Sequence, residues 1–353
     1  MKILFIPHVP NKNVINRVYE LAKNSDGIVL DWYIDNSSLK NKIFSQAKTL
    51  MKTISLNENF LSLPLLFKPE SFASYINTYM LNQVVKKYKI DVVVNANALL
   101  FDVERIEVPV IYDLVDDHLT KNLTIGLTEK RVKKIEKDIK HARGVVCVTE
   151  SIEEKVKKIH PKTITIENGV YIDKFKKARS LKKEFGLENK KVFGYIGGVE
   201  EWTGIEKACE AYKQIKSSDT AMMIVGDSKS SFFQNLKKRF KNDIIFTGAV
   251  APNEVANYFK TLDIGLIPFE LNDFTNNAFP IKALEYGLGG AQVIATPLKV
   301  LEQKRLPYIH FCPIEDFPNW MQKIEKKEFS YDFTPYSWQN QAQKLLQFIK
   351  DVL

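Results

Sequence analysis

A stretch near the end of the chain contains Pro268-Phe269, then Asn276-Asn277-Ala278-Phe279-Pro280-Ile281-Lys282-Ala283-Leu284-Glu285-Tyr286, and then Gly289-Gly290-Ala291-Gln292-Val293-Ile294-Ala295-Thr296. This order predicts a loop, a short helix, a glycine turn and a buried strand. Pro280 is expected at the first helical position, where its missing N–H costs nothing. Lys282 would then lie in the first helical turn, and Glu285, three residues later, would share its face.

The pair Lys282 and Glu285 carries the first indication of a ligand. The helix dipole disfavours a lysine in the first turn unless an anion occupies that end of the helix. A carboxylate on the same face can accept hydrogen bonds from hydroxyl groups. The spacing therefore predicts a site for an anionic, hydroxyl-bearing ligand. It fits a solvated lysine–glutamate pair on a surface helix equally well, and both interpretations stay open at this point.

The order P-F … P-x-K-x-x-E-Y … G … V-I-A-T resembles the donor-sugar motif of GT-B glycosyltransferases of the retaining family-four type. The resemblance implies that Glu285 holds the ribose of a nucleotide diphosphate sugar. It also implies donor contacts from Pro268, Pro280 and Ile281. Asn277 stands where the family pattern has a glutamate. An amide can still hydrogen-bond a sugar hydroxyl, but it carries no charge and cannot act as a base.

A glycine pair follows another predicted strand, in Tyr195-Ile196-Gly197-Gly198-Val199-Glu200-Glu201-Trp202. Gly197 and Gly198 would let the backbone approach a diphosphate closely and offer N–H donors, although a plain tight turn has the same pattern. The resembling family places an arginine soon after this glycine and a lysine near Thr203, and neither cation occurs here. Lys282 is therefore the candidate phosphate cation, unless activity has been lost.

Two further strand ends belong to the same resemblance. Gly226 and Thr247 each follow a predicted strand, and the resemblance places them near the nucleotide base, although both also fit ordinary strand ends. In the first half of the chain, the run Tyr112-Asp113-Leu114-Val115-Asp116-Asp117-His118 directly follows a strand. Such groups can position an acceptor hydroxyl or act as a base, or simply cap the next helix. The run resembles the acceptor-side segment of these enzymes, and Asp116 and His118 join Lys282 as candidate catalytic residues.

Buried strands alternate with amphipathic helices along the chain, which is typical of parallel α/β layers. We expect two doubly wound, Rossmann-like domains, and the resemblance implies that they face a cleft in the GT-B arrangement. The acceptor-side domain is expected at 1–170 and the donor domain at 171–335, with a basic helix at 176–190 opening the second series. The terminal helix, about 336–353, is expected to pack back on the first domain.

The composition limits the kinds of partner. The formal net charge of +9 indicates an anionic partner, and the absence of nucleic-acid-binding motifs argues against DNA or RNA. Residues 39–53, followed by the apolar stretch 60–67, interleave basic and apolar side chains as an interfacial helix does, which favours an anionic membrane surface. An ordinary surface helix fits the same pattern.

The cysteines, the histidines and the hydropathy of the chain indicate its cellular location. The three cysteines are far apart and the five histidines show no ligand spacing, so neither a disulfide framework nor a metal site is expected. There is no run of about 18 consecutive apolar residues, and the amino-terminal apolar run is too short for a signal peptide. We expect a cytoplasmic protein that is peripheral at the inner face of the cell membrane.

Together these features predict a retaining, metal-independent, hexosyltransferase-like enzyme without a cofactor. It would move a sugar from a nucleotide diphosphate sugar to a glycan acceptor, including a lipid-linked one, in cell-surface glycan or polysaccharide biosynthesis. The alternative is a catalytically silent, glycosyltransferase-like binding or partner subunit. That alternative draws on Asn277 and on the missing arginine–lysine pair.

Overall fold

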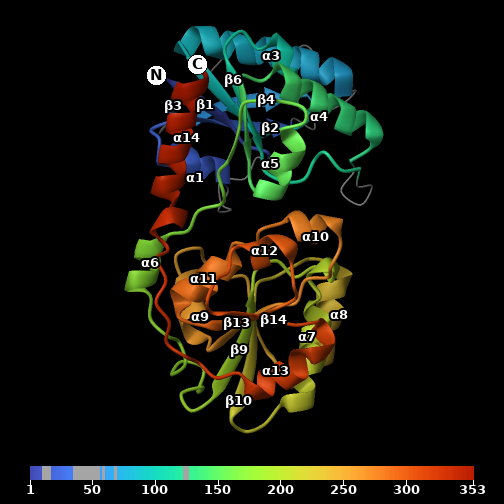
Figure 1. Ribbon diagram of the computed structural model, residues 1–353, viewed down its shortest axis with the longest axis vertical. Helices are drawn as coiled ribbons and strands as arrows, with labels where there is room; N and C mark the ends of the chain where they lie inside the picture. Colours follow the sequence, from blue (N-terminus) through green and yellow to red (C-terminus); the bar gives the residue numbers. More distant parts are fainter. Residues whose placement is uncertain (10–16, 35–55, 58–59, 67–69, 122–126) are drawn as a thin grey trace. The chain divides into compact units, whose positions relative to one another are not determined.

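A computed structural model of the chain describes residues 1–9, 17–34, 56–57, 60–66, 70–121 and 127–353 (Figure 1). The chain divides into two compact units. The first consists of Met1–Asn168 together with Trp338–Leu353, and the second of Gly169–Ser337. Each unit has its own hydrophobic core around one sheet. Of the helices in the described part of the chain, none has both the length and the apolar character needed to cross a bilayer.

The sheet of the first unit has the strand order β3-β4-β2-β1-β5-β6-β7-β8. Its strands are parallel except for the β3–β4 pair. Buried β-branched and leucine side chains fill most strands, as expected for a sheet covered on both faces. The strands are β1 (Ile3–Ile6), β2 (Ile28–Ile34), β3 (Leu56–Asn57), β4 (Phe60–Leu65), β5 (Val92–Asn95), β6 (Val110–Leu114), β7 (Gly144–Cys147) and β8 (Thr163–Thr165).

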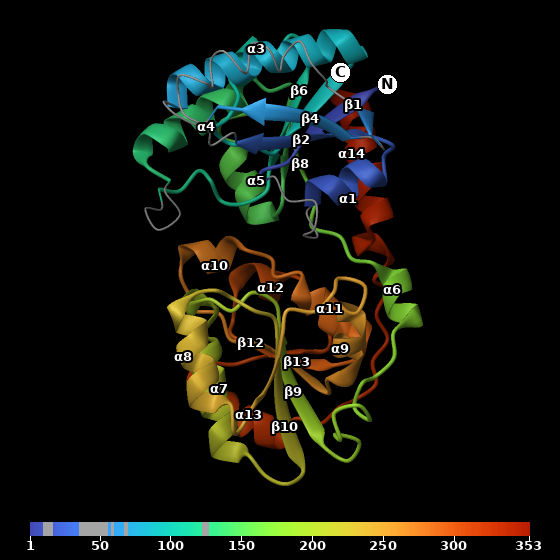
Figure 2. The same ribbon diagram turned by 180° about the vertical axis from the view of Figure 1, so that it is seen from behind.

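The helices of the first unit include one from the far end of the chain. The ring of Phe348 lies where a side chain at Gly144 would be, and the Arg143 guanidinium donates to the Val352 carbonyl at 2.7 Å. These contacts hold the terminal helix in the first unit, where it packs against α1 (Figure 2). The helices are α1 (Arg17–Lys23), α3 (Glu70–Tyr88), η1 (Val103–Arg105), α4 (Glu129–His141), α5 (Glu150–Val156) and α14 (Trp338–Val352).

The sheet of the second unit is parallel throughout, in the order β11-β10-β9-β12-β13-β14. Strands β10 and β11 follow β9 on one side of it, and β12, β13 and β14 follow on the other side. The strand order therefore reverses between the neighbours β9 and β12. The strands are β9 (Lys191–Ile196), β10 (Thr220–Val225), β11 (Ile245–Gly248), β12 (Ile264–Ile267), β13 (Gln292–Ala295) and β14 (Ile309–Phe311).

A buried tyrosine joins the two central strands of this sheet to a helix. The Tyr286 hydroxyl accepts from the Ile196 amide at 3.2 Å and lies 3.2 Å from the Gly194 carbonyl, and its ring occupies the space beside Gly265. The helices are α6 (Ile172–Lys177), η2 (Glu201–Thr203), α7 (Ile205–Ile215), α8 (Ser231–Phe240), α9 (Val255–Thr261), α10 (Asp273–Asn277), α11 (Lys282–Gly289), α12 (Lys299–Gln303), η3 (Ile314–Asp316), α13 (Phe317–Lys323) and η4 (Thr334–Tyr336).

The predicted helix at 176–190 is wrong. Helix α6 ends at Lys177, and the chain then forms turns as far as β9. Leu187 donates its amide to the Lys182 carbonyl at 2.8 Å, around Gly186 at φ +64°. Only Leu181 and Leu187 are buried in this lysine-rich stretch, so it has no continuous apolar stripe with which to pack as a helix.

Two other expectations change. Pro280 precedes the helix instead of opening it, because α11 begins at Lys282 with Ile281 as its N-cap. The stretch 60–67 is not an interfacial segment over its first six residues. Residues 60–65 form β4, whose alternate side chains Leu61, Leu63 and Leu65 are buried beside β2. The other part of that prediction, residues 39–53, lies outside the described residues.

Candidate functional site

The candidate site of the second unit lies at the carboxyl ends of β9 and β12. Ligands of doubly wound sheets bind where the strand order reverses, and it reverses between these strands. The Lys282 ammonium lies 3.7 Å from the ring centre of Tyr195 and 5.3 Å from that of Phe269. A side chain at Gly197 would approach this ammonium to 3.0 Å. The crevice therefore holds one lysine, bounded by two aromatic rings and a glycine.

The glycines at these strand ends serve close backbone packing. A Cβ at Gly226, where φ is +143°, would lie 2.1 Å from the Gly197 carbonyl oxygen. The Gly197 amide already donates to the Val225 carbonyl at 2.9 Å, so it is not the open donor that the sequence suggested. Gly198 is exposed, and its carbonyl accepts from the Tyr195 hydroxyl at 2.7 Å. The turn is thus fixed, with Gly198 at its solvent-facing end.

Lys282 and Glu285 are both partly buried, one turn apart on α11. Burial lowers the pKa of Lys282 to about 7, and the nearby Glu285 carboxylate opposes that shift. Burial raises the pKa of Glu285 to about 7, and Lys282 and Lys174 oppose that shift. Two groups with opposite charge preferences therefore titrate together near neutral pH, which is typical of functional sites.

The loop that leads into α11 is held by local hydrogen bonds. The Thr296 hydroxyl donates to the Phe269 carbonyl at 2.7 Å, and the Ala283 amide donates to the Pro280 carbonyl at 2.9 Å. Asn277, the last residue of α10, is partly buried. Pro268, Pro280 and Ile281 stand on this same loop or helix start. The segment between β12 and α11 therefore carries four of the ten predicted donor residues, and α11 itself carries Lys282 and Glu285.

The two remaining predicted donor residues lie on the other side of β9. Gly226 directly follows β10 and donates its amide to the Gly248 carbonyl at 3.0 Å. Thr247 belongs to β11, two strands from β9, and its hydroxyl donates to the Gly248 carbonyl at 2.9 Å. The structure thus brings Gly226 against the Gly197 turn, whereas Thr247 stands farther along the same edge.

Sequence reasoning missed an adjoining cavity of about 350 Å³ at the ends of β12, β13 and β14. Trp202, which is exposed, packs edge-on against Phe269 beside it, with 5.0 Å between the ring centres. The lining residues come from segments far apart in the chain, so no local motif marks them, although three of those segments directly follow a strand. They are Lys207, Pro268, Phe269, Glu270, Leu271, Thr296, Pro313, Ile314 and Glu315.

In the first unit, Asp116 and His118 follow β6, as predicted. The His118 amide donates to the Asp116 carbonyl at 2.8 Å. Burial raises the pKa of Asp116 to about 6 and lowers that of His118 to about 4, with His8 adding to the second shift. At pH 7 His118 is therefore neutral and Asp116 mostly ionised. Asp117 between them is bound by Lys155 at 2.5 Å and has a structural role.

A buried ion pair near this segment was not predicted. The Arg17 guanidinium donates to the Asp113 carboxylate at 3.1 Å and to the Glu167 carbonyl at 2.9 Å. Within the described residues, Nη2 of Arg17 and Nδ1 of His8 are buried without a hydrogen-bond partner. Arg17 lies at the start of a short amphipathic helix and belongs to no motif, so no local pattern marks it.

Two doubly wound, parallel-sheet units in one chain have the architecture of the GT-B glycosyltransferases. Solved structures agree. A glycosyltransferase from Rickettsia africae superposes with a TM-score of 0.72 at 18% identity over 99% of this chain and 98% of its own. Anabaena HepE in complex with UDP gives a TM-score of 0.66 at 14% identity over 100% and 98%.

Residues 190–325, which lie in the second unit, match the family Glycosyl transferases group 1, and the chain has the fold of GT-B glycosyltransferase structures. A curated relative is the putative teichuronic acid biosynthesis glycosyltransferase TuaH of Bacillus subtilis. It is 28% identical over 207 residues, which are 56% of this chain and 51% of the relative. The chain spans about half the length of the curated relatives it matches.

Proposed function

We propose that this protein is a glycosyltransferase that moves a sugar from a nucleotide diphosphate sugar to a glycan acceptor. One observation carries the proposal: the Lys282 ammonium lies against Gly197 at the switch point, with Glu285 one turn further on. A cation and a carboxylate at this point suit a diphosphate and a ribose. The UDP bound by HepE and the name of TuaH support a UDP-sugar and a cell-surface glycan.

The donor residues divide by the part of the ligand that each would contact. Lys282, the exposed turn at Gly198 and the start of α11 would stabilise the leaving diphosphate by charge and by oriented dipoles. Glu285 would accept hydrogen bonds from the ribose, and Asn277 would bind the transferred sugar. Gly226 and Thr247 would border the base, and Gly197, Pro268, Pro280 and Ile281 shape the backbone around them.

The chemistry that we propose is retention of the anomeric configuration without a metal ion. The bond from the anomeric carbon to the diphosphate breaks, and a bond from that carbon to the acceptor oxygen forms on the same face of the sugar. The acceptor proton needs a base, and Asp116 and neutral His118 are the candidates in the first unit. Lys282 would neutralise the negative charge of the diphosphate. A divalent cation has this role in other transferases.

We also propose where the enzyme acts and what kind of acceptor it uses. The net charge of +9 and the teichuronic acid relative support a cytoplasmic enzyme at the inner face of the membrane, acting on a lipid-linked glycan.

The test is a thermal-shift series with UDP, GDP, ADP, CMP and dTDP and their sugar conjugates, with Mg²⁺ or EDTA. A ligand that binds only the folded protein stabilises it by about 2.7 kcal/mol at 100 times its Kd. We expect UDP to raise the melting temperature equally in Mg²⁺ and in EDTA. Glu285→Ala should lose the shift, and Glu328→Ala, an exposed glutamate of the same unit, should keep it.

The second candidate function is a silent partner subunit, favoured by Asn277 and by the absence of cations after Gly197. It predicts flat melting curves with every nucleotide. Binding of UDP without release of UDP from UDP-sugars in the presence of cell-surface glycan extracts would also favour it. Turnover with the anomeric configuration retained, measured by NMR of the product, would exclude it.

A further inference from the structure

Helix α3 exposes three aromatic side chains along one stripe. Phe72 and Tyr75 are each 51% exposed and Tyr79 is 57% exposed. They lie at i, i+3 and i+7, so they share one face of the helix. The opposite face, which includes Met80, Leu81, Val84 and Val85, is buried in the core of the first unit. The stripe is therefore not needed to hold α3 in place.

The surface around this stripe is basic. The Arg105 guanidinium lies 5.2 Å from the ring centre of Tyr75. After Glu70, which pairs with Arg131 of α4, helix α3 has no acidic residue, and it ends with Lys86 and Lys87. Lys86 pairs with the Glu107 carboxylate at 3.0 Å, so part of the positive charge is neutralised locally. Three exposed aromatic side chains in one stripe, with lysines on the same helix, are still unusual on a protein surface that faces only water.

Helix α4 lies beside α3 and extends the positive charge. Both views show the two helices as neighbours (Figures 1 and 2), and a cavity of about 350 Å³ is lined by residues of both. Helix α4 has six Lys or Arg residues against three Asp or Glu. The exposed lysines of α4 are Lys130, Lys133, Lys137 and Lys140.

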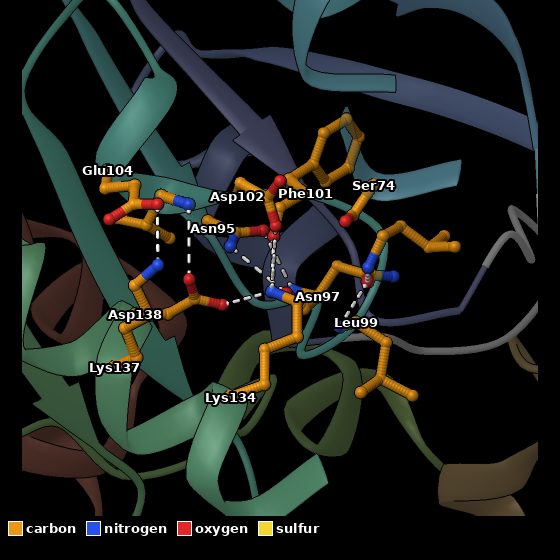
Figure 3. A network of polar contacts seen from close by, with 12 residues as sticks. Ser74, Asn95, Asn97, Leu99, Phe101, Asp102, Glu104, Lys134, Lys137 and Asp138 are labelled. Atoms are coloured by element: carbon orange, nitrogen blue, oxygen red, sulfur yellow. Dashed lines mark hydrogen bonds and ion pairs between the residues drawn. The ribbon is translucent and has the colours of Figure 1, made fainter. Parts of the chain in front are cut away.

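Ion pairs and a hydrogen bond hold α4 against residues 101–104, beside η1 (Figure 3). The Lys134 ammonium donates to the Phe101 carbonyl at 2.6 Å and to the Asp138 carboxylate at 2.5 Å, and Lys137 donates to Glu104 at 2.6 Å. Glu104 is adjacent to Arg105, which contacts Tyr75. These contacts link α4, through Glu104, to the segment that carries Arg105 and so to the Tyr75 ring of the aromatic stripe.

We infer that Phe72, Tyr75 and Tyr79, with the exposed lysines of α4, form the docking surface of this protein for an anionic lipid bilayer. The inference rests on the proposed function, in which the acceptor is presented at a membrane. Aromatic rings are favoured at the depth of the lipid headgroups, and neighbouring lysines are attracted to anionic lipids. This surface differs from the one expected at 39–67, of which residues 60–65 belong to a strand.

The test is co-sedimentation of the full chain with vesicles of phosphatidylcholine alone and of equal parts phosphatidylcholine and phosphatidylglycerol. The aromatic variant is Phe72→Gln, Tyr75→Gln and Tyr79→Gln, because glutamine keeps the helix propensity of the exposed positions. We expect it to lower binding to the anionic vesicles at least about tenfold, since three apolar contacts are lost. Tyr33→Gln, an exposed tyrosine on β2, is the control.

The charge variant replaces Lys130, Lys133 and Lys140 with glutamine. Its matched control removes the same charge from the end of α8 in the second unit, at Lys237, Lys238 and the C-cap residue Lys241. Electrostatic attraction to the bilayer is screened within about 10 Å at 0.1 M salt. We therefore expect weaker binding only for the α4 variant at low salt, with the difference shrinking as salt is added.

Several outcomes would overturn the inference. One is equal binding of the wild type to both kinds of vesicle, and another is wild-type binding by the aromatic variant. A third is a wild-type dimer that the aromatic variant converts to a monomer in sedimentation velocity, because the stripe would then serve a second copy. The melting shift with UDP is measured in parallel. If vesicle binding follows the predicted pattern without that shift, the docking surface stands and the proposed enzyme fails.

Discussion

Proton exchange on nucleotide binding tests the roles of Lys282 and Glu285 directly. Both groups have a pKa of about 7, so each is about half protonated at pH 7. A diphosphate beside Lys282 raises its pKa, and Lys282 takes up about half a proton. Ribose hydroxyls that donate to Glu285 favour its carboxylate, which releases about half a proton. The wild type should therefore bind UDP at pH 7 with almost no net proton exchange.

Two variants separate these opposing changes. In Glu285→Gln, Lys282 loses the carboxylate that raises its pKa, so it is mostly neutral at pH 7 and should take up more than about half a proton. In Lys282→Met, Glu285 loses the lysine that lowers its pKa, so UDP binding should release a similar amount. The assay is isothermal titration calorimetry in phosphate and in Tris, because the enthalpy difference between the buffers reports the protons exchanged.

The direction in which UDP shifts the pKa of Lys282 also determines how the UDP affinity of Glu285→Gln depends on pH. The pKa of Lys282 is higher with UDP bound than without it. The affinity for UDP is therefore highest at pH values below the pKa that Lys282 has in the unliganded protein. Affinity is then lost as pH rises, by at most about tenfold per pH unit. Glu328→Gln should behave as the wild type. If Glu285→Gln bound UDP between pH 7 and pH 8 with the same enthalpy in both buffers, Lys282 would not be the phosphate cation and the reasoning would fail.

Three other predictions concern stability, measured by urea unfolding. Gly226→Ala places a Cβ 2.1 Å from the Gly197 carbonyl oxygen and should destabilise by about 3 kcal/mol and abolish the UDP shift. Gly186→Ala, at φ +64° in open space, should cost only about 1 kcal/mol, and equal losses would contradict the packing argument. Asp113→Asn leaves the buried Arg17 charge uncompensated and should cost about 3 kcal/mol, whereas a loss below about 1 kcal/mol would show that the pair contributes little. The folded pKa of Asp116 is raised, so its stabilising effect is complete below its unfolded pKa of about 4 and disappears as pH rises to about 6. The stability advantage of wild type over Asp116→Asn should therefore fall by about 1–2 kcal/mol from pH 4 to pH 6, allowing for partial solvent exposure, and a constant difference would refute this.

The sequence predicted elements whose stability comes from their own pattern. Residues 264–267 form the expected strand because a continuous apolar run is buried on both faces of a parallel sheet. Residues 60–65 were misinterpreted because an alternating pattern shows only that one side is apolar. Pairing with β2 shows what that side faces. The prediction of a helix at 176–190 was wrong for the opposite reason. The local charge pattern suggested a helix, but this stretch has no continuous apolar stripe that could pack against the core.

The same distinction separates the site residues that were found from those that were missed. Lys282 and Glu285 lie three positions apart, so one helical turn brings them together and the sequence alone indicates it. Arg17 and Asp113 meet only because the fold of the first unit brings the start of α1 to β6, 96 residues further along the chain. Tyr195 contributes its ring to the Lys282 crevice through a strand order that no local pattern encodes. Topology, not residue type, determined what could be predicted.

The missing cations of the glycine loop bear on the choice between enzyme and silent subunit. Thr203 is 1% exposed and its hydroxyl donates to the Glu200 carbonyl at 2.5 Å, so this position is part of a turn. The cation of the site comes instead from α11, and the absence of a side chain at Gly197 leaves the space that the Lys282 ammonium fills. Lys282 therefore places a positive group in the crevice, although the glycine loop lacks the arginine and lysine of the pattern it resembles.

Burial of that ammonium disfavours its charged form. Lys282 therefore lowers the folding stability of the unliganded protein unless an anion binds beside it. A silent subunit gains nothing from such a group, whereas an enzyme uses it on a diphosphate. We predict that Lys282→Met raises the melting temperature without nucleotide by a few degrees and makes the increase with UDP smaller, because the variant keeps the ribose contact but loses the phosphate cation. Lys213→Met, on the exposed side of α7, should change neither. An unchanged melting temperature and an unchanged UDP effect in Lys282→Met would leave the lysine without a function and would favour the silent subunit.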